Sequence, residues 1–149
     1  MDGHLNLMPL QCDADIAALL REAKTVAIKI ASPKSQRDSN KVLKFLVEHG
    51  YEVYPINPGH AGEEIHGRTV YADLNDVPVA IDLVDIFRRS EDVASIVNKA
   101  IEIGARAVWM QLGIASEMAA AKAEAAGLKV VMDRCPAIDI PRFQRLGLM

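Results

Sequence analysis

Short apolar runs alternate with amphipathic stretches along most of the chain. The β-branched run TVAIKIA (25–31) predicts a strand, and SNKVLKFLVEHG (39–50) carries apolar residues at the three- and four-residue spacing of a helix. The same alternation returns further along the chain. It predicts four more strands over residues 51–57, 80–87, 105–111 and 128–133, and helices over 13–24, 90–104 and 116–127.

Three of the predicted helices end at a glycine (Gly50, Gly104 and Gly127), and the next strand begins almost at once. This regularity is typical of tandem βα units with a parallel sheet. We therefore expect an α/β protein: a three-layer, doubly wound Rossmann-like fold with a five-stranded, mainly parallel sheet. Residues 58–79 are rich in glycine, proline and polar residues, and a short strand at RTVY and a helical turn near LNDV are expected there.

The chain has 149 residues, which predicts a single domain with a core over about residues 25–134. Its formal net charge is −3. A general nucleic-acid binder would be more basic, so no nucleic-acid partner is expected and any anion site must come from local charge. No apolar run has the length of a membrane span, and the first residues lack a secretory signal pattern. A cytoplasmic protein without a membrane partner is expected.

In open parallel sheets, ligands bind beyond the carboxyl ends of the strands. The segment after the first predicted strand, SPKSQRDS (32–39), offers serine hydroxyl groups together with Lys34 and Arg37, which suits a phosphate group. The alternative is a solvated loop in which Asp38 or Ser39 caps the following helix.

Two arginines follow the third predicted strand. Arg88 and Arg89 precede a helix whose expected N-cap is Ser90. Cations at a helix N-terminus oppose the macrodipole, at roughly 0.3–1 kcal/mol each. Either an anionic ligand or salt bridges to Asp85 or Glu91 would explain them.

The segment after the second predicted strand excludes one class of ligand. NAD-binding domains place an acidic residue there to hold the ribose, whereas this chain has Asn57 and Pro58. The G-x-G-x-x-G fingerprint and the P-loop pattern are also missing from the sequence. A dinucleotide-dependent oxidoreductase is therefore not expected.

Residues with catalytic or metal-binding chemistry are scattered. His60 and His66 share a loop but no third ligand lies at metal-binding spacing, so no metal site is expected. Cys135 has no histidine nearby in sequence, and a buried packing role is the commoner one. Cys12 lies far from it, and no disulfide is expected in a reducing compartment. No catalytic residue is predicted.

Lys29 lies in the strand expected to be central, where both faces are usually apolar. It needs a partner if it is buried. Asp82 or Asp85 on the third strand could serve, or Lys29 could reach a bound anion. Trp109 and Met110 of the fourth strand are expected in the core.

Five motifs together resemble a known family. The segments ASPKSQRDS, YPINP, VDIFRRSE, AVWMQLG and VVMDRCP look like those of the small stand-alone CoA-binding proteins. These proteins are similar to the CoA-binding domain of the succinyl-CoA synthetase α subunit. The resemblance spans about residues 20–141 and implies binding of coenzyme A or an acyl-CoA through its nucleotide portion.

The resemblance also implies the ligand contacts. They are a phosphate loop at Ser32, Pro33, Lys34, Arg37 and Ser39, an adenosine border at Asn57 and Pro58, flanking residues Phe87, Arg88 and Arg89, and a far side at Gln111 and Gly113. The synthetases carry a phosphorylated histidine on a second domain, for which this chain has no room. A non-catalytic or regulatory binding module is therefore expected, and its candidate protein partners are a second copy of the chain or an acyl-CoA enzyme. The competing interpretations are an acyl-CoA enzyme subunit and a protein-interaction domain with a degenerate pocket.

One position departs from the family pattern. Members usually read VVGASPK, whereas here Ile30 stands in the place of the glycine and Lys29 precedes it. Glycine lets a phosphate approach the backbone closely, and an isoleucine side chain partly fills that space. Two hypotheses follow: Lys29 and the arginines sustain anion binding with altered affinity, or CoA binding has been lost.

Overall fold

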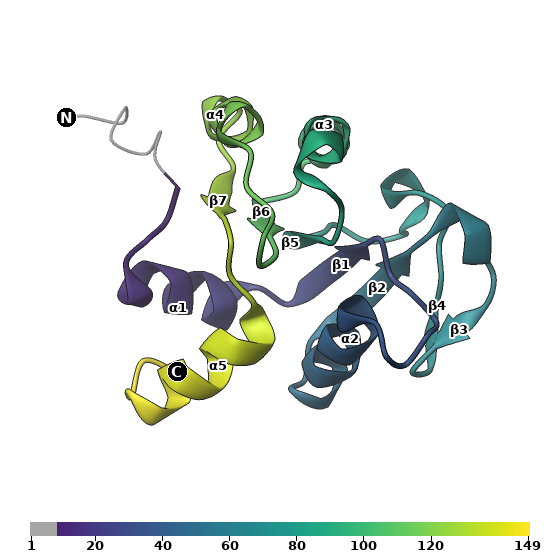
Figure 1. Ribbon diagram of the computed structural model, residues 1–149, viewed down its shortest axis with the longest axis horizontal. Helices are drawn as coiled ribbons and strands as arrows, with labels where there is room; N and C mark the ends of the chain where they lie inside the picture. Colours follow the sequence, from purple (N-terminus) through teal and green to yellow (C-terminus); the bar gives the residue numbers. More distant parts are fainter. Residues whose placement is uncertain (1–8) are drawn as a thin grey trace.

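Five parallel strands form one sheet at the centre of the computed structural model, which describes residues 9–149 (Figure 1). Their order across the sheet is β2–β1–β5–β6–β7, and every neighbouring pair is parallel. This arrangement confirms the expected Rossmann-like α/β fold. The strands are β1 (Thr25–Lys29), β2 (Glu52–Ile56), β5 (Leu83–Ile86), β6 (Ala107–Met110) and β7 (Lys129–Val131).

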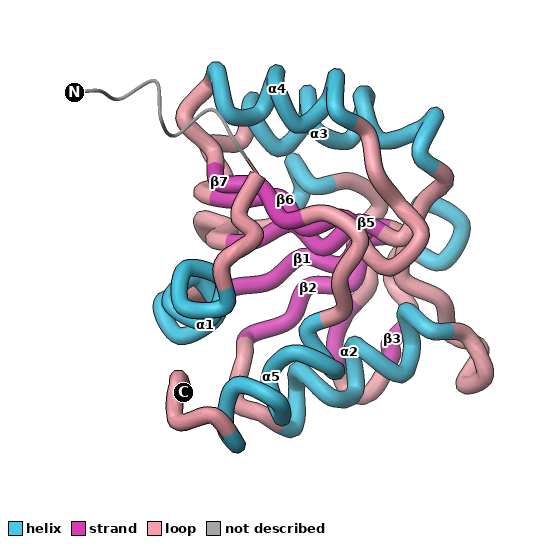
Figure 2. Tube along the Cα trace, turned by 60° about the vertical axis from the view of Figure 1, so that its left-hand side comes forward, coloured by secondary structure: helices cyan, strands magenta, loops and turns pink. Residues whose placement is uncertain are grey.

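Helices cover both faces of the sheet (Figure 2). On one face lie α1 (Asp13–Glu22), α2 (Asp38–Glu48) and α5 (Pro136–Arg145), and on the other lie α3 (Val93–Glu102) and α4 (Glu117–Ala125). Successive strand residues point to opposite faces, so each strand feeds both cores. In β6, for example, Trp109 packs on the α1–α2–α5 side and Met110 on the α3–α4 side, both fully buried as expected.

The predicted elements are present with slightly shorter bounds. The glycines after α2, α3 and α4 all have positive φ angles, at Gly50 (90°), Gly104 (74°) and Gly127 (92°), a conformation that glycine adopts without steric cost. The expected short strand is β4 (Arg68–Thr69), paired with β3 (Glu64–Ile65), and the expected turn is the 3₁₀ helix η3 (Leu74–Asp76). A further 3₁₀ helix, η2 (Pro58–His60), follows β2.

Helix α5 was not predicted, because the sequence analysis assigned no element after residue 133. Pro136 occupies the first turn, where proline is tolerated, but Pro141 lies inside the helix, where proline normally breaks the pattern. Ile140 and Phe143 are buried against the sheet at helical spacing. The core therefore extends beyond residue 134, and the pair at 140 and 143 was the available signal.

Candidate functional site

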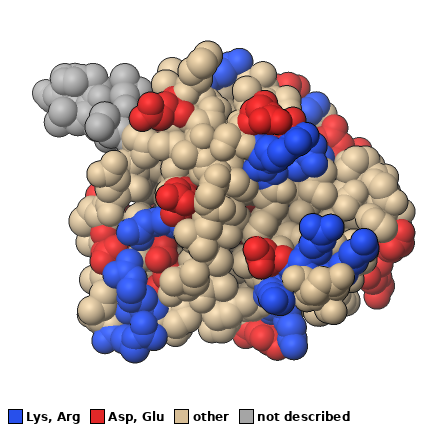
Figure 3. Space-filling view, viewed as in Figure 1, with Lys and Arg blue, Asp and Glu red and all other residues tan. Residues whose placement is uncertain are grey.

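The sheet reverses its strand order between β1 and β5. The chain leaves β1 through α2 to β2 on one side, and then returns to β5, β6 and β7 on the other. In open α/β sheets this reversal opens a crevice at the carboxyl ends of the strands. Figure 3 shows Lys and Arg side chains on this face of the molecule, over the segment between β1 and α2 and over the start of α3.

Two adjoining cavities occupy this crevice and share Asp38, Phe87 and Arg88 in their walls. The first has a volume of about 490 Å³ and lies against the β1–α2 loop. The second, of about 680 Å³, extends toward β6 and α5. Ten of the twelve predicted site residues line them: Ser32, Lys34, Arg37, Ser39, Asn57, Phe87, Arg88, Arg89, Gln111 and Gly113.

The other two predicted residues, Pro33 and Pro58, are exposed and do not line either cavity. The crevice also includes residues that the sequence prediction did not assign to it. They are Asp38, Lys41, Val42, Leu112, Ile114, Cys135 and Ile138. Ile30, which was expected to fill part of the phosphate region, lines the first cavity. Ile138 lies on the unpredicted helix α5, so no rule about strand ends could have found it.

The glycine-free loop between β1 and α2 is held by side chains. The Ser32 N–H donates to the Ser39 hydroxyl (3.1 Å), and the Asn40 amide donates to the Ser32 carbonyl (2.9 Å). Directly after β2, the Asn57 amide donates to the Ala31 carbonyl (2.7 Å). These bonds fix the backbone while the side chains of Lys34 and Arg37 remain exposed.

Helix α2 is not capped as the sequence indicated. Asp38 is its first residue, Arg37 is its N-cap, and Arg37 makes no side-chain hydrogen bond to the first turn. Ser39 is buried and receives the Ser32 N–H instead of capping the helix. The alternative of an ordinary Asp38 or Ser39 cap is therefore wrong.

The two arginines after β5 make local ion pairs. Arg88 lies 3.2 Å from Asp92, and Arg89 lies 3.5 Å from Glu91 and 3.8 Å from Asp92. Salt bridges were one of the two expected explanations, although Asp92 rather than Asp85 is the main acid. Both arginines still line the crevice.

The start of the next helix also differs from the prediction. Ser90 begins a 3₁₀ turn, η4 (Ser90–Asp92), and the α-helix starts only at Val93. The Ser90 hydroxyl accepts the Ala115 N–H (3.2 Å) and so ties the β5 tip to the β6 tip.

Lys29 has neither of its expected partners. Asp82 accepts hydrogen bonds from the backbone N–H groups of Lys24 and Thr25, at the amino ends of the strands and away from the crevice. Asp85 lies against Gln111. Burial lowers the pKa of the half-buried Lys29 amine; Asp73 opposes this shift. Lys29 thus lies on the α3 side of the sheet, and among residues 9–149 it makes no ion pair within 4 Å.

The two loop histidines, considered above as possible metal ligands, each contact a neighbouring side chain. His66 lies 2.7 Å from the Asn40 side-chain oxygen, and His60 lies 3.1 Å from Glu63. Within the part of the chain that the structure describes, no three potential metal-binding side chains cluster. No helix of residues 9–149 has the length and apolar character needed to span a membrane.

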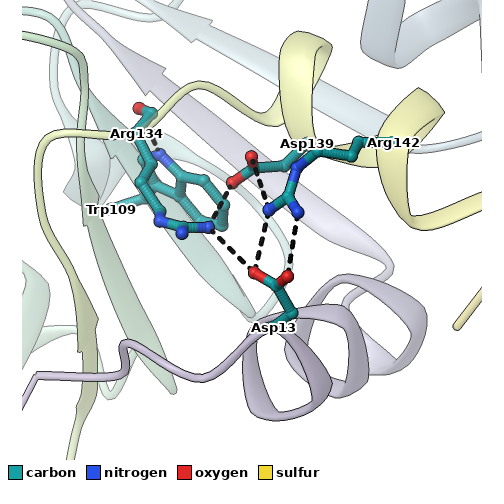
Figure 4. Close-up of polar contacts among 5 residues, drawn as sticks. All are labelled: Asp13, Trp109, Arg134, Asp139 and Arg142. Atoms are coloured by element: carbon teal, nitrogen blue, oxygen red, sulfur yellow. Dashed lines mark hydrogen bonds and ion pairs between the residues drawn. The ribbon is translucent and has the colours of Figure 1, made fainter. Parts of the chain in front are cut away.

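Cys135 lines the wider cavity. Its neighbour in the chain, Arg134, belongs to an ion-pair cluster with Asp13, Asp139 and Arg142 (Figure 4). Cys135 is buried at the N-cap of α5. Arg134 pairs with Asp139 (3.2 Å), and its carbonyl accepts the Trp109 indole N–H (2.7 Å).

The same cluster joins the first and last helices. Both Asp13 oxygens lie 2.8 Å from the Arg142 guanidinium, whose hydrogen bond is the main factor lowering the pKa of Asp13. Arg134 also approaches Asp13, at 3.6 Å. The cluster therefore anchors the wall that carries Cys135 to both α1 and α5.

The comparisons with known proteins agree with this geometry. Residues 24–141 match the model of a CoA binding domain family. The chain is 32% identical over 122 residues to the uncharacterised protein YneT of Bacillus subtilis, which covers 82% of this chain and 89% of that protein.

Solved structures and a larger enzyme also match. A hypothetical protein from Pyrococcus horikoshii superposes with a TM-score of 0.84 and 38% identity, covering 92% of this chain and 96% of that one. The α subunit of an ADP-forming acetate–CoA ligase from Pyrococcus furiosus is 30% identical over 89 residues, 57% of this chain but 19% of that protein. These matches confirm the resemblance found in the motifs, and the chain belongs to the CoA binding domain family.

Proposed function

We propose that this protein binds coenzyme A or an acyl-CoA in the crevice between β1 and β5. The observation that carries the proposal is the crevice itself, in which two adjoining cavities share the wall at Phe87 and Arg88. The first cavity contains the exposed cations Lys34 and Arg37 and suits the nucleotide and its phosphates. The second is wide enough for the extended arm that ends in the thiol.

The residues fit the phosphates of CoA despite the missing glycine. Side-chain hydrogen bonds from Ser39, Asn40 and Asn57 hold the loop in place, so the loop is ordered without glycine. Ile30 lines the first cavity and is only partly buried, so its side chain narrows the phosphate region. We therefore expect CoA binding to be retained with altered affinity.

The role we propose is a binding or regulatory module of the cytoplasm, without independent catalysis. A second candidate is an acyl-CoA enzyme subunit that acts with a partner chain, and the similarity to a part of an acetate–CoA ligase α subunit favours it. A homo-oligomer is compatible with either role. Turnover that appears only on adding a partner chain would favour the second candidate.

Thermal unfolding with and without CoA, acetyl-CoA, NAD and ATP tests the proposal. A ligand at a hundredfold its dissociation constant stabilises by about 2.7 kcal/mol, which raises Tm by several degrees in a domain of this size. We expect a shift with CoA and acetyl-CoA, and none with NAD. The absence of a shift at millimolar CoA would contradict the proposal and favour a protein-interaction domain.

A further inference from the structure

A carboxyl group is buried in the middle of the sheet, below the crevice. Asp85 lies on β5 between Ile28 of β1 and Trp109 of β6, and it is 0% exposed. Leu83, two residues earlier on the strand, packs in the α1–α2–α5 core, so Asp85 points to the same side. A buried carboxyl group needs a hydrogen-bonding partner.

Gln111 is that partner. Its side-chain nitrogen, with the amide oriented to satisfy the contact, lies 3.0 Å from one Asp85 oxygen and 3.3 Å from the other. Gln111 is 5% exposed and lines the wider cavity, whereas Asp85 does not reach it. Gln111 therefore connects the buried carboxyl group to the crevice.

The same atom positions serve two hydrogen-bond arrangements. A carboxylate at Asp85 accepts a hydrogen bond from the Gln111 amide N–H, which leaves the Gln111 carbonyl oxygen for the crevice. A neutral carboxyl group donates its O–H to that carbonyl oxygen instead, which leaves the N–H groups for the crevice. Protonation of Asp85 therefore replaces the hydrogen-bond acceptor that Gln111 presents to the crevice with a donor.

The surroundings favour proton uptake by Asp85. Burial raises the pKa of its carboxyl group well above the ordinary value. The helix residues that pack on this side of the sheet are largely apolar, as in Leu20 of α1, Leu43 of α2 and Phe143 of α5. The titratable and charged groups of these helices are, on α1, Asp13, Asp15, Arg21 and Glu22, on α2, Asp38, Lys41, Lys44 and Glu48, and on α5, Asp139, Arg142 and Arg145. Arg134 and the Cys135 thiol precede α5.

We propose that Asp85 is a specificity-determining residue of the crevice, because its carboxyl group fixes which end of the Gln111 carboxamide faces the ligand. A neutral Asp85 presents an N–H donor, which matches the thioester carbonyl of an acyl-CoA. An ionised Asp85 presents an acceptor, which matches the weak S–H donor of free CoA. This inference rests on the proposed function and adds a proton-dependent choice between the two ligands.

The test is the ratio of two dissociation constants, measured by calorimetry for CoA and acetyl-CoA from pH 5.5 to 7.5, below the range in which the thiol of free CoA ionises. CoA phosphates also titrate at about pH 6, but both ligands share them and the effect cancels in the ratio. One hydrogen bond corresponds to a change of about two- to tenfold. We expect acetyl-CoA to be favoured by this factor at low pH, with the change centred on the Asp85 pKa measured by ¹³C NMR.

Two variants separate this effect from a general change in structure. Asp85→Asn cannot titrate, and Gln111→Met has no amide to reorient, so the ratio should not change with pH in either. The exposed Asp15→Asn variant is the matched control and should behave as the wild type. A ratio that is constant in the wild type, or that changes equally in Asp85→Asn, overturns the inference.

Failure of the proposed function would look different, because neither ligand would bind at any pH. Unfolding provides an independent check on Asp85. Since its pKa is raised in the folded state, the wild type loses stability as pH rises from the unfolded pKa through the folded one. The free energy of unfolding of Asp85→Asn should therefore rise relative to that of the wild type as pH increases across that range. If the two plots of unfolding free energy against pH run parallel, Asp85 does not titrate as proposed.

Discussion

Two basic loops flank the crevice, and they differ in whether their cations form ion pairs. In the loop between β1 and α2, Lys34 and Arg37 are exposed and make no ion pair within 4 Å among residues 9–149. In the loop after β5, Arg88 pairs with Asp92, and Arg89 with Glu91 and Asp92. The first loop is held by neutral side chains, whereas the second combines these ion pairs with the hydrogen bond from the Ala115 N–H to the Ser90 hydroxyl.

The difference bears on how much each loop can contribute to binding. A phosphate that approaches Lys34 or Arg37 gains a charge-assisted hydrogen bond without displacing a protein carboxylate. A phosphate that approaches Arg88 or Arg89 competes with the acids already there, which also repel it. The two loops carry equal positive charge in these residues, yet we expect the first to supply most of the affinity.

The largest expected effect is on CoA affinity when Lys34 and Arg37 are removed. We expect Lys34→Ala/Arg37→Ala to weaken CoA binding about 100-fold and Arg88→Ala/Arg89→Ala about tenfold at most, since hydrogen bonds to charged groups contribute about 1.5–3 kcal/mol each. Calorimetry measures both. The control is Lys122→Ala/Lys129→Ala, which removes the same charge away from the crevice. Equal losses in the two loop variants would remove the distinction.

Most of the fold could be predicted from periodicity alone. The five strands and four of the helices follow from apolar spacing and from glycines such as Gly50 and Gly127, because both signals are local. Helix α5 could not be predicted in the same way. Pro141 interrupts its pattern, and the burial of Phe143 that stabilises it depends on the distant α1 and α2.

The site was predictable as a place but not as a set of contacts. The rule about strand ends brought most of the predicted residues to one crevice because a parallel sheet aligns those ends. The side-chain pairings could not be predicted from the sequence. Ser39 accepts a backbone N–H instead of capping its helix, and Lys29 lies on the α3 side of the sheet, away from Asp85. These depend on side-chain directions that one sequence does not encode locally.

The next largest effect concerns the missing glycine of the first loop. We expect Ile30→Gly to tighten CoA binding by about three- to tenfold, because it removes the side chain that narrows the first cavity. The free energy of unfolding should fall by about 1 kcal/mol from the added backbone freedom. Titration calorimetry and urea unfolding measure the two effects. Ile30→Ala is the control, since it removes the side chain without adding glycine flexibility; unchanged affinity in both variants would show that Ile30 does not limit binding.

A smaller effect is expected from loosening the first loop. Asn57 donates to the Ala31 carbonyl and accepts the Gly59 N–H, so Asn57→Ala removes two hydrogen bonds. We expect the free energy of unfolding to fall by about 1–2 kcal/mol and CoA affinity by about threefold. Asn75→Ala, at an exposed position away from the crevice, should change neither. Full affinity in Asn57→Ala would mean that the loop needs no support from β2.

The smallest effect would come from freeing the paired arginines. Glu91→Gln/Asp92→Asn removes the acids beside Arg88 and Arg89 while keeping side-chain size. We expect CoA to bind about threefold more tightly, because its phosphates no longer compete with the Glu91 and Asp92 carboxylates for the arginines. This gain in affinity should decrease at high salt, which screens the charges. Stability should change by only about 1 kcal/mol, because Glu91 is exposed and Asp92 is partly exposed. Calorimetry at low and high salt measures the change. Tighter binding would show that Glu91 and Asp92 limit the contribution of Arg88 and Arg89 to CoA binding. Unchanged binding would mean that these arginines stabilise only the local fold.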